Sequence, residues 1–239
     1  YGFFIWENNT SIINLYRFFY EDYNPYRNYE SDFSGYLLPA GKVDVATVKK
    51  LQGNASLLVA ANISADLVKK IQSMASIFSM GQIADILTPI DGTMAYAASD
   101  NVNFDKGMRG IVTTNGNPTP ALLGVINNIA PAKVDGKYIT FTDGGATSGD
   151  IEIAKAADRF KGAALGVVVS GDAVRGYAGG VTSPIKTLSA MLEPDHGSLE
   201  LSIEVTTSNE KENSLLTILN YVGDTAAQEK AAAAPAPSE

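Results

Sequence analysis

A repeated pattern constrains the fold of this chain more than any other feature of its sequence. Residues 51–59 (LQGNASLLV) align with residues 160–168 (FKGAALGVV), and residues typical of a helix follow each segment. Further along, PIDGTMAY at 89–96 aligns with PDHGSLEL at 194–201. Each copy therefore predicts a strand, a helix, a Pro-x-x-Gly turn and a second strand. One such unit cannot cover its own sheet face, so we expect the two copies to share a core.

The spacing of apolar residues predicts an α+β fold. Strands are predicted over 55–63, 93–98, 108–114 and 137–142, and helices over 66–78, 82–87, 121–129, 172–177 and 183–192. Residues 199–206 alternate strictly between apolar and polar side chains, which predicts a strand whose polar face is exposed to water. We therefore expect duplicated strand–helix–strand units that form a largely antiparallel sheet, with helices packed on one face.

Aromatic residues are concentrated at the start of the chain. Thirteen of the 21 Phe, Trp and Tyr residues lie within residues 1–36, and Asn8 and Asn9 separate two aromatic stretches. This pattern predicts a hairpin of two aromatic strands. The aromatic side chains could form a stacking platform for sugar rings, but sheet packing explains them more simply.

Three segments make up the expected domain organisation. We interpret 1–36 as an aromatic hairpin left from a truncated N-terminal region, 37–222 as the duplicated domain with copies at about 51–142 and 160–222, and 223–239 as a mobile Ala/Pro tail. A closing helix is predicted over 214–222. Its apolar stripe predicts that Leu216 or Leu219 is buried beside the second copy.

Composition removes several classes of function. The formal net charge of −8 gives no excess of basic residues for a nucleic-acid backbone, so nucleic acid is not an expected partner. The chain has no cysteine and a single histidine, His196, which excludes thiol nucleophiles and sites of several Cys or His ligands. We expect no cofactor, no metal and no enzymatic activity. The longest apolar runs have the length of a strand, so no membrane span is expected.

His196 is the most conspicuous candidate for chemistry, because acidic residues precede it in EPDHG. The residue that aligns with it in the first copy is Asp91, and the two precede Gly197 and Gly92 respectively. Asp and His are both common before a glycine in a turn, whereas no single catalytic role would accept either residue at this position. We therefore interpret Asp91, Gly92, His196 and Gly197 as structural turn residues and predict no catalytic residue.

Two glycine-rich stretches could be mistaken for ligand loops. Residues 171–180 follow a predicted strand but have neither the Gly-x-Gly-x-x-Gly spacing nor a Gly-Lys-[Ser/Thr] ending. Residues 143–150 begin and end with aspartate, which would repel a phosphate, and their oxygen ligands do not have EF-hand spacing. We interpret both stretches as flexible connections.

The repeated motifs resemble those of a known family. The L-x-G-x-A-x-L-x-V segment, the helix after it, the Pro-x-x-Gly-[Thr/Ser] step and the closing leucine-rich helix are similar to the Bacteroidales envelope lipoproteins grouped as domain of unknown function 4836. Those proteins carry tandem strand–helix–strand units and an Ile-Asp-Gly step like that at 90–92. The resemblance covers roughly residues 51–222.

This resemblance implies a place in the cell envelope, on its periplasmic or surface side. It implies anchoring through a lipidated N-terminus that is missing from this sequence, and it implies no catalytic residue. Asp224-Thr225-Ala226 is similar to the short O-glycosylation pattern of Bacteroidetes envelope proteins, so Thr225 is a candidate modification site.

Two functions follow from these observations. The first is a non-catalytic, envelope lipoprotein-like binding or scaffold module whose partner is an envelope protein or a glycan. The alternative is a carbohydrate-binding or carbohydrate-active protein that uses surface aromatics and carboxylates. The alternative requires two carboxyl groups about 5–10 Å apart in one cleft.

Overall fold

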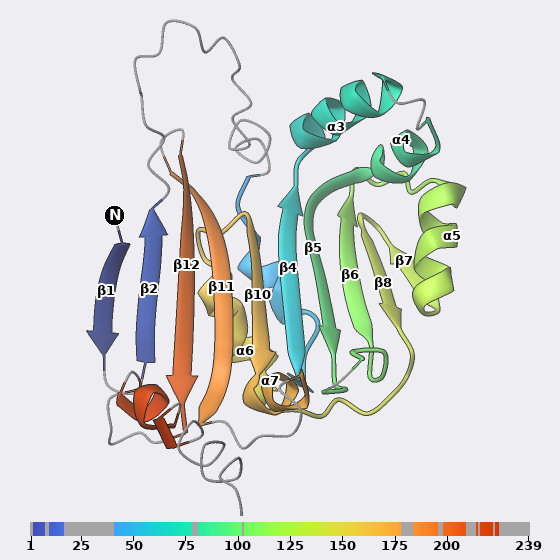
Figure 1. The fold of residues 1–239 in the computed structure, drawn as a ribbon. Coiled ribbons are helices and arrows are strands. Elements are labelled where there is room, and N and C mark those ends of the chain that lie inside the picture. Colours follow the sequence, from blue (N-terminus) through green and yellow to red (C-terminus); the bar gives the residue numbers. More distant parts are fainter. Residues whose placement is uncertain are drawn as a thin grey trace, which may run out of the picture.

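Ten strands of the computed structural model form one open sheet (Figure 1). The structure describes residues 2–7, 10–16, 41–77, 81–101, 103–177, 184–195, 198–208, 214, 216–221 and 223–224. The strand order is β1-β2-β12-β11-β10-β4-β5-β6-β8-β7, and every neighbouring pair is antiparallel. The strands are β1 (Gly2–Glu7), β2 (Thr10–Tyr16), β4 (Leu57–Ile63), β5 (Ile90–Ala98), β6 (Arg109–Thr114), β7 (Ala132–Asp135), β8 (Tyr138–Thr142), β10 (Leu165–Ser170), β11 (Ile185–Asp195) and β12 (Ser198–Thr207). The short strands β3 (Asn54–Ala55) and β9 (Ile151–Glu152) pair separately.

The helices are α2 (Val45–Lys49), α3 (Ala65–Ile77), α4 (Gly81–Leu87), α5 (Pro120–Ile129), α6 (Ile153–Ala156), the 3-10 helix η2 (Ala157–Phe160) and α7 (Gly171–Tyr177). Helices α3, α4, α5 and α7 lie close to predicted positions, but α2, α6 and η2 were not predicted, and residues 185–192, predicted as helix, belong to strand β11. The hydroxyl of Ser64 accepts the backbone N–H of Leu67 at 3.2 Å and thereby caps α3. Thr119 caps α5 in the same way, and Pro120 occupies the first turn of that helix, where its missing N–H costs nothing.

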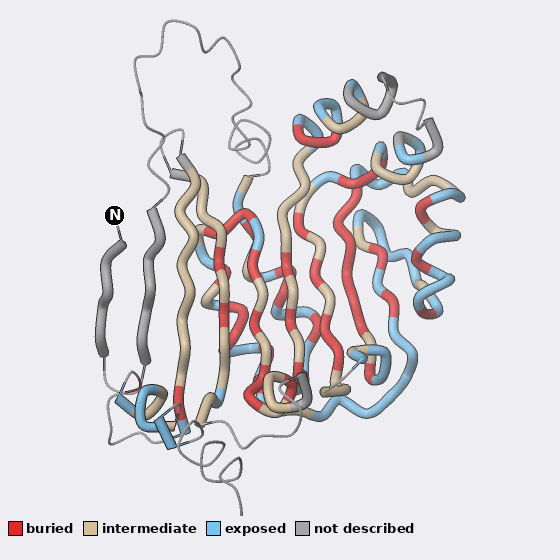
Figure 2. The backbone as a smooth tube through the Cα atoms, viewed as in Figure 1, coloured by how far each residue is buried: buried red, intermediate tan, exposed pale blue. Residues whose placement is uncertain are grey.

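The predicted α+β class with a largely antiparallel sheet is confirmed. The main core lies where α2, α6 and η2 pack on one face of the central strands, around fully buried Leu58, Ile111 and Phe160. Figure 2 shows that buried segments, in red, are frequent along the central strands of the sheet. A second core lies on the opposite face, where α4 and α5 pack against β5, β6 and β8. Helices therefore pack on both faces of the sheet, which corrects the prediction that they pack on one face. Alternate residues of β5 serve the two cores, since Ala95 belongs to the first and Met94 contacts the second.

Strand β12 corrects one expectation about the sheet. The sequence predicted that its polar side chains face water and its apolar side chains face the helices. In the structure Glu204 forms an ion pair of 3.0 Å with Arg159 of η2, and Arg159 also donates to Ser189 on β11. The polar side of β12 therefore faces a helix, and Leu201, Ile203 and Val205 point to the other face. A cation from the packed helix compensates these polar groups, so alternation alone does not identify the solvent side.

A pair of acids on the same side of β11 and β12 gives a testable pH dependence. Glu193 lies directly opposite Glu200, and burial together with that like charge raises the pKa of Glu193, while Lys42 counteracts them. Because folding raises this pKa, the stabilisation is complete below the ordinary glutamate pKa of 4.5 and is lost as the pH rises through the folded value. Glu193→Gln is therefore expected to increase the free energy of unfolding at pH 7 by up to about 1 kcal/mol.

Urea unfolding of the parent and the Glu193→Gln variant at pH 7 and at pH 4 measures this effect. The gain should become much smaller at pH 4, where Glu193 is mostly protonated in both states. Glu204→Gln is the matched control, because it removes an attractive ion pair with Arg159 and should lower stability at pH 7. A gain from Glu193→Gln that is equal at both pH values would show that the charge of Glu193 is not the cause.

The two halves of the sheet have the same strand order when it is counted outward from the central β4–β10 pair. One half reads β4-β5-β6-β8-β7 and the other reads β10-β11-β12-β2-β1. The predicted N-terminal hairpin is present as β1 and β2, with Glu7 opposite Thr10, and β2 pairs with β12. It occupies the place in its half that the β7–β8 hairpin occupies in the other. The predicted equivalence of the two Pro-x-x-Gly steps is wrong, because Gly92 lies at the start of β5, the strand next to β4, whereas the step at 194–197 comes at the end of β11 and before β12. That the halves arose by duplication stays a prediction of the sequence.

The closing helix does not bury the residues that the sequence selected. Residues 216–221 are helical, but the side chains of Leu216 and Leu219 are 47% and 57% exposed. The predicted burial of these two leucines is therefore wrong. The apolar stripe occupies more than one helical face, and a helix with such a stripe can expose one part of it while another part packs.

Candidate functional site

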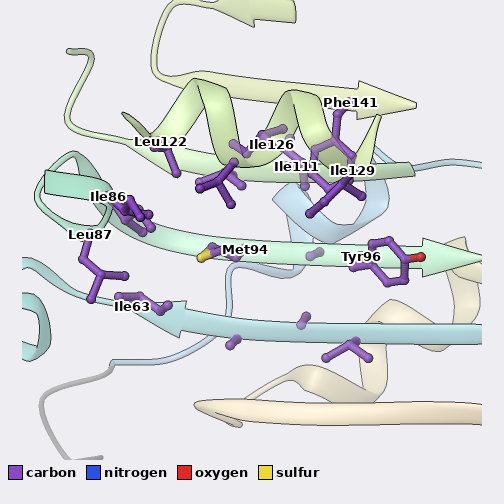
Figure 3. Close-up of a pocket in the computed structure, with 17 residues that line it drawn as sticks. Ile63, Ile86, Leu87, Met94, Tyr96, Ile111, Leu122, Ile126, Ile129 and Phe141 are labelled. Atoms are coloured by element: carbon purple, nitrogen blue, oxygen red, sulfur yellow. The ribbon is translucent and has the colours of Figure 1, made fainter. Parts of the chain in front are cut away.

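An apolar cavity of about 460 Å³ lies at one end of the sheet, between β4, β5, β6 and β8 on one side and helices α4 and α5 on the other (Figure 3). Its 17 lining residues are Val59, Ala60, Ala61, Ile63, Ile86, Leu87, Ile90, Met94, Ala95, Tyr96, Ile111, Val112, Leu122, Val125, Ile126, Ile129 and Phe141. None of these side chains carries a formal charge at neutral pH. The volume lies within the range of cavities that hold small ligands.

Helix α5 forms the outer wall of this cavity. Its residues Leu122 and Ile126 are buried, while Val125 and Ile129, on an adjacent stripe of the same helix, are 42% and 47% exposed. The spacing of these four residues gives an apolar surface wider than one contact line. A helix with this surface packs on the sheet through its inner stripe and leaves apolar side chains at the rim of the cavity.

The start of β5 contributes Ile90 and Met94 to the lining, and two of the predicted turn residues, Asp91 and Gly92, lie between them in sequence. Gly92 has a φ of +128°, a conformation that favours glycine, and the register of β5 on β6 shifts between Ile90 and Met94. The carboxylate of Asp91 accepts the backbone N–H of Ala65 at 3.1 Å, which is the first residue of α3. Asp91 and Gly92 thus have the structural role that was predicted, but they form an irregular strand start and a cap and do not form a separate turn.

Tyr96 is the single titratable residue of the lining. Its hydroxyl donates to the carbonyl oxygen of Phe104 at 2.6 Å. Burial raises the pKa of Tyr96, and the charges of Asp143 and Asp105 raise it further. A tyrosine held in its neutral form and already engaged as a donor is a poor general base at neutral pH. The lining therefore offers no side chain suited to accept a proton at neutral pH.

Loop 143–150, which was predicted as a flexible connection, is held by hydrogen bonds. The carboxylate of Asp143 accepts the N–H of Gly145 at 2.8 Å, and the backbone N–H of Ser148 donates to the hydroxyl of Ser99 at 3.1 Å. Desolvation opposes the ionisation of Asp143, but several backbone N–H bonds outweigh it and lower the pKa of this carboxyl. These contacts correct the expectation of flexibility, because the Asx turn supplies its own backbone donors.

Other sequence predictions have varied outcomes. The stretch 171–177 forms helix α7 and is not a flexible connection. His196, Gly197 and Thr225 lie outside the described residues. In the part of the chain that the structure describes, no group of three or more Asp, Glu or His residues could hold a metal ion. Within that same part, no helix has the length and apolar character needed to cross a membrane.

Sequence reasoning missed the cavity itself. The available signal was the apolar breadth of 121–129, which was used to predict a helix and not a binding surface. The cavity appears only when strands β4, β5, β6 and β8 are placed side by side, and this arrangement is not local in sequence.

Comparison with known proteins gives little further information. No protein-family model matches the sequence. No curated protein matches it. A solved structure, "Structure of crystal form III of TP0453", aligns with a TM-score of 0.36 at 10% sequence identity and covers 74% of this chain and 98% of that chain. A likeness at that TM-score carries no argument about fold or function.

Proposed function

We propose that the chain is a non-catalytic binding module of the bacterial cell envelope and that the cavity beneath α5 takes an acyl chain. The envelope location and the kinship with domain of unknown function 4836 rest on the sequence resemblance alone. The observation that carries the binding function is the lining of the cavity, whose side chains are all uncharged and almost all aliphatic.

The chemistry of the lining selects the ligand. A polar or sugar-like ligand would leave its hydroxyl groups without partners, because the one polar side chain, Tyr96, is already bonded to Phe104. An acyl chain brings only methylene groups, each of which gains about 0.8 kcal/mol when it leaves water. The exposed rim residues Val125 and Ile129 give such a chain a route between α5 and the sheet.

The carbohydrate alternative receives no support from this cavity. The required pair of carboxylates facing one cleft is not part of its lining. The aromatic side chains of 1–36, on which that alternative depended, lie outside the described side chains. The scaffold function is compatible with acyl-chain binding, because a bound lipid can hold a scaffold protein at a membrane.

The test is binding of cis-parinaric acid, a fluorescent acyl chain, to the parent and to two variants. Val125→Glu places a charge at the cavity rim and is expected to weaken binding at least about tenfold. Val134→Glu is the matched control, because Val134 is 44% exposed, close to the 42% of Val125, but does not line the cavity. Displacement by palmitate or by a lysophospholipid distinguishes a free fatty acid from a membrane lipid as the source of the chain.

A third variant tests whether weaker binding reflects loss of cavity space and not only the added charge of Val125→Glu. Ala61→Phe fills the cavity from the sheet side with an apolar side chain and should also weaken binding, although it adds no charge. Thermal melts establish that each variant is folded. Equal affinity of the parent, Val125→Glu and Ala61→Phe would refute acyl-chain binding at this cavity.

A further inference from the structure

A second cavity, of about 360 Å³, lies where the end of α2 meets β6, β7 and β8. Its lining contains three basic residues, Lys50, Arg109 and Lys133, together with Thr140 and Thr142. No aspartate or glutamate belongs to this lining. Such a concentration of positive charge is unexpected in a chain whose formal net charge is −8.

Arg109 gives this cavity a fixed positive wall. Its side chain is 7% exposed, and its guanidinium donates to the carbonyl oxygens of Leu51, Gln52, Asn54 and Gly107. These bonds use three of its five N–H groups, so two have no acceptor in the described part of the chain. Burial lowers the pKa of Arg109 and the charge of Asp143 opposes this, but an arginine stays protonated at neutral pH.

The lysines around the cavity add charge that the protein does not neutralise. The Lys50 ammonium lies 4.1 Å from the centroid of the Tyr138 ring, and that of Lys137 lies 5.3 Å from the same centroid. Lys133 forms no ion pair with any described carboxylate. Bringing like charges together costs free energy, and a bound anion would remove that cost.

Hydroxyl groups complete the lining. Thr142 accepts the backbone N–H of Gly144 at 3.1 Å, so its own hydroxyl hydrogen stays available for a ligand oxygen. Thr140 points its hydroxyl to the carbonyl oxygen of Lys133 at 3.4 Å and could exchange this long bond for a better acceptor. Ammonium, guanidinium and hydroxyl donors together suit an oxyanion with several acceptor atoms.

We propose that this second cavity binds a phosphate group, either as inorganic phosphate or as the phosphate of a small phosphomonoester. A phosphate offers oxygens on several sides and can be reached at once from β6, β7 and the end of α2. A carboxylate is flat and has two oxygens, so it would leave part of this donor set unused. The two cavities share the lining residues Ile111 and Phe141, but none of the basic or hydroxyl side chains of the second cavity lines the apolar one.

Titration with inorganic phosphate at constant ionic strength, followed by amide NMR, tests the proposal. Saturable shifts are expected at 50–51, 109–111 and 140–142. The double variant Lys50→Gln/Lys133→Gln should bind phosphate at least about tenfold more weakly. Acetate is the second ligand, and the parent should bind it more weakly than phosphate.

The matched control is Lys69→Gln/Lys155→Gln, which changes the net charge by the same amount at two exposed lysines outside the cavity. It should retain phosphate affinity within about twofold. An equal loss in both double variants would overturn the proposal and leave only a general charge effect. Acetate binding as tight as phosphate binding, or phosphate shifts that do not saturate, would overturn it as well. Affinity for cis-parinaric acid should not change in either variant, which separates failure of this site from failure of the apolar one.

Discussion

Replacing Arg109 by methionine is expected to lower the free energy of unfolding by about 3 to 5 kcal/mol. Arg109 holds together the segment before β4, because its guanidinium binds carbonyl oxygens at Leu51, Gln52 and Asn54. Gln52 in that segment has a φ of +45°, which is costly for a residue with a side chain. Methionine has a similar length but no donor, so it would leave these acceptors without partners.

Chemical unfolding of the parent and Arg109→Met measures this loss. Arg159→Met is the matched control, because Arg159 is more exposed and bonds mainly to side chains, among them Glu204 and Ser189. Its loss should be near 1 kcal/mol. If the two variants are equally stable, the carbonyl contacts of Arg109 do not stabilise the fold as inferred.

Replacing Phe160 by alanine is expected to cost a further large amount, about 3 to 5 kcal/mol. Phe160 ends η2, is completely buried, and belongs to the main core with Leu58 and Val168. Its ring lies close to Gly166 of β10, where an added Cβ would lie 3.0 Å from the ring and would collide with the sulfur of Met191. Alanine would leave a cavity between η2 and the centre of the sheet, and the rigid strands around it cannot close that space.

The exposed Leu219 provides the control for this experiment. Leu219→Ala removes apolar atoms from a side chain that is 57% exposed, so its effect should stay within about 0.5 kcal/mol. Phe160→Leu should fall between the two, because it retains part of the buried volume. A loss below 1 kcal/mol for Phe160→Ala would show that the core relaxes around this position.

Local features of the fold could be predicted from the sequence, and the functional surfaces could not. The helix starts predicted near 66 and 121 are close to those observed, because Ser64 and Pro120 set them through neighbouring residues alone. The solvent side of β12 was predicted wrongly because Arg159, which pairs with Glu204, comes from a distant segment. The sequence did not single out Arg109, because its carbonyl acceptors at Leu51, Gln52 and Asn54 are more than 50 residues away.

Each candidate cavity is assembled in the same non-local way. The apolar cavity joins helix α5 to β4, and the cationic cavity joins Lys50 to Lys133. Neither pair of segments is adjacent in sequence. Spacing arguments detect which face of a single element is apolar or charged, but they do not predict which faces of separate elements meet.

The strand order also constrains how the chain can fold. Strand β2 pairs with β12, so residues 10–16 cannot form their hydrogen bonds to the rest of the sheet until residues 200–206 are present. The half formed by β4, β5, β6, β7 and β8 is continuous in sequence and can assemble while the rest of the chain is still being synthesised. The other half combines strands from residues 2–16 with strands from residues 165–207, so it cannot assemble until both segments are present. We infer that β4 to β8 form first and that closure of the N-terminal hairpin on β12 is a late, slow step.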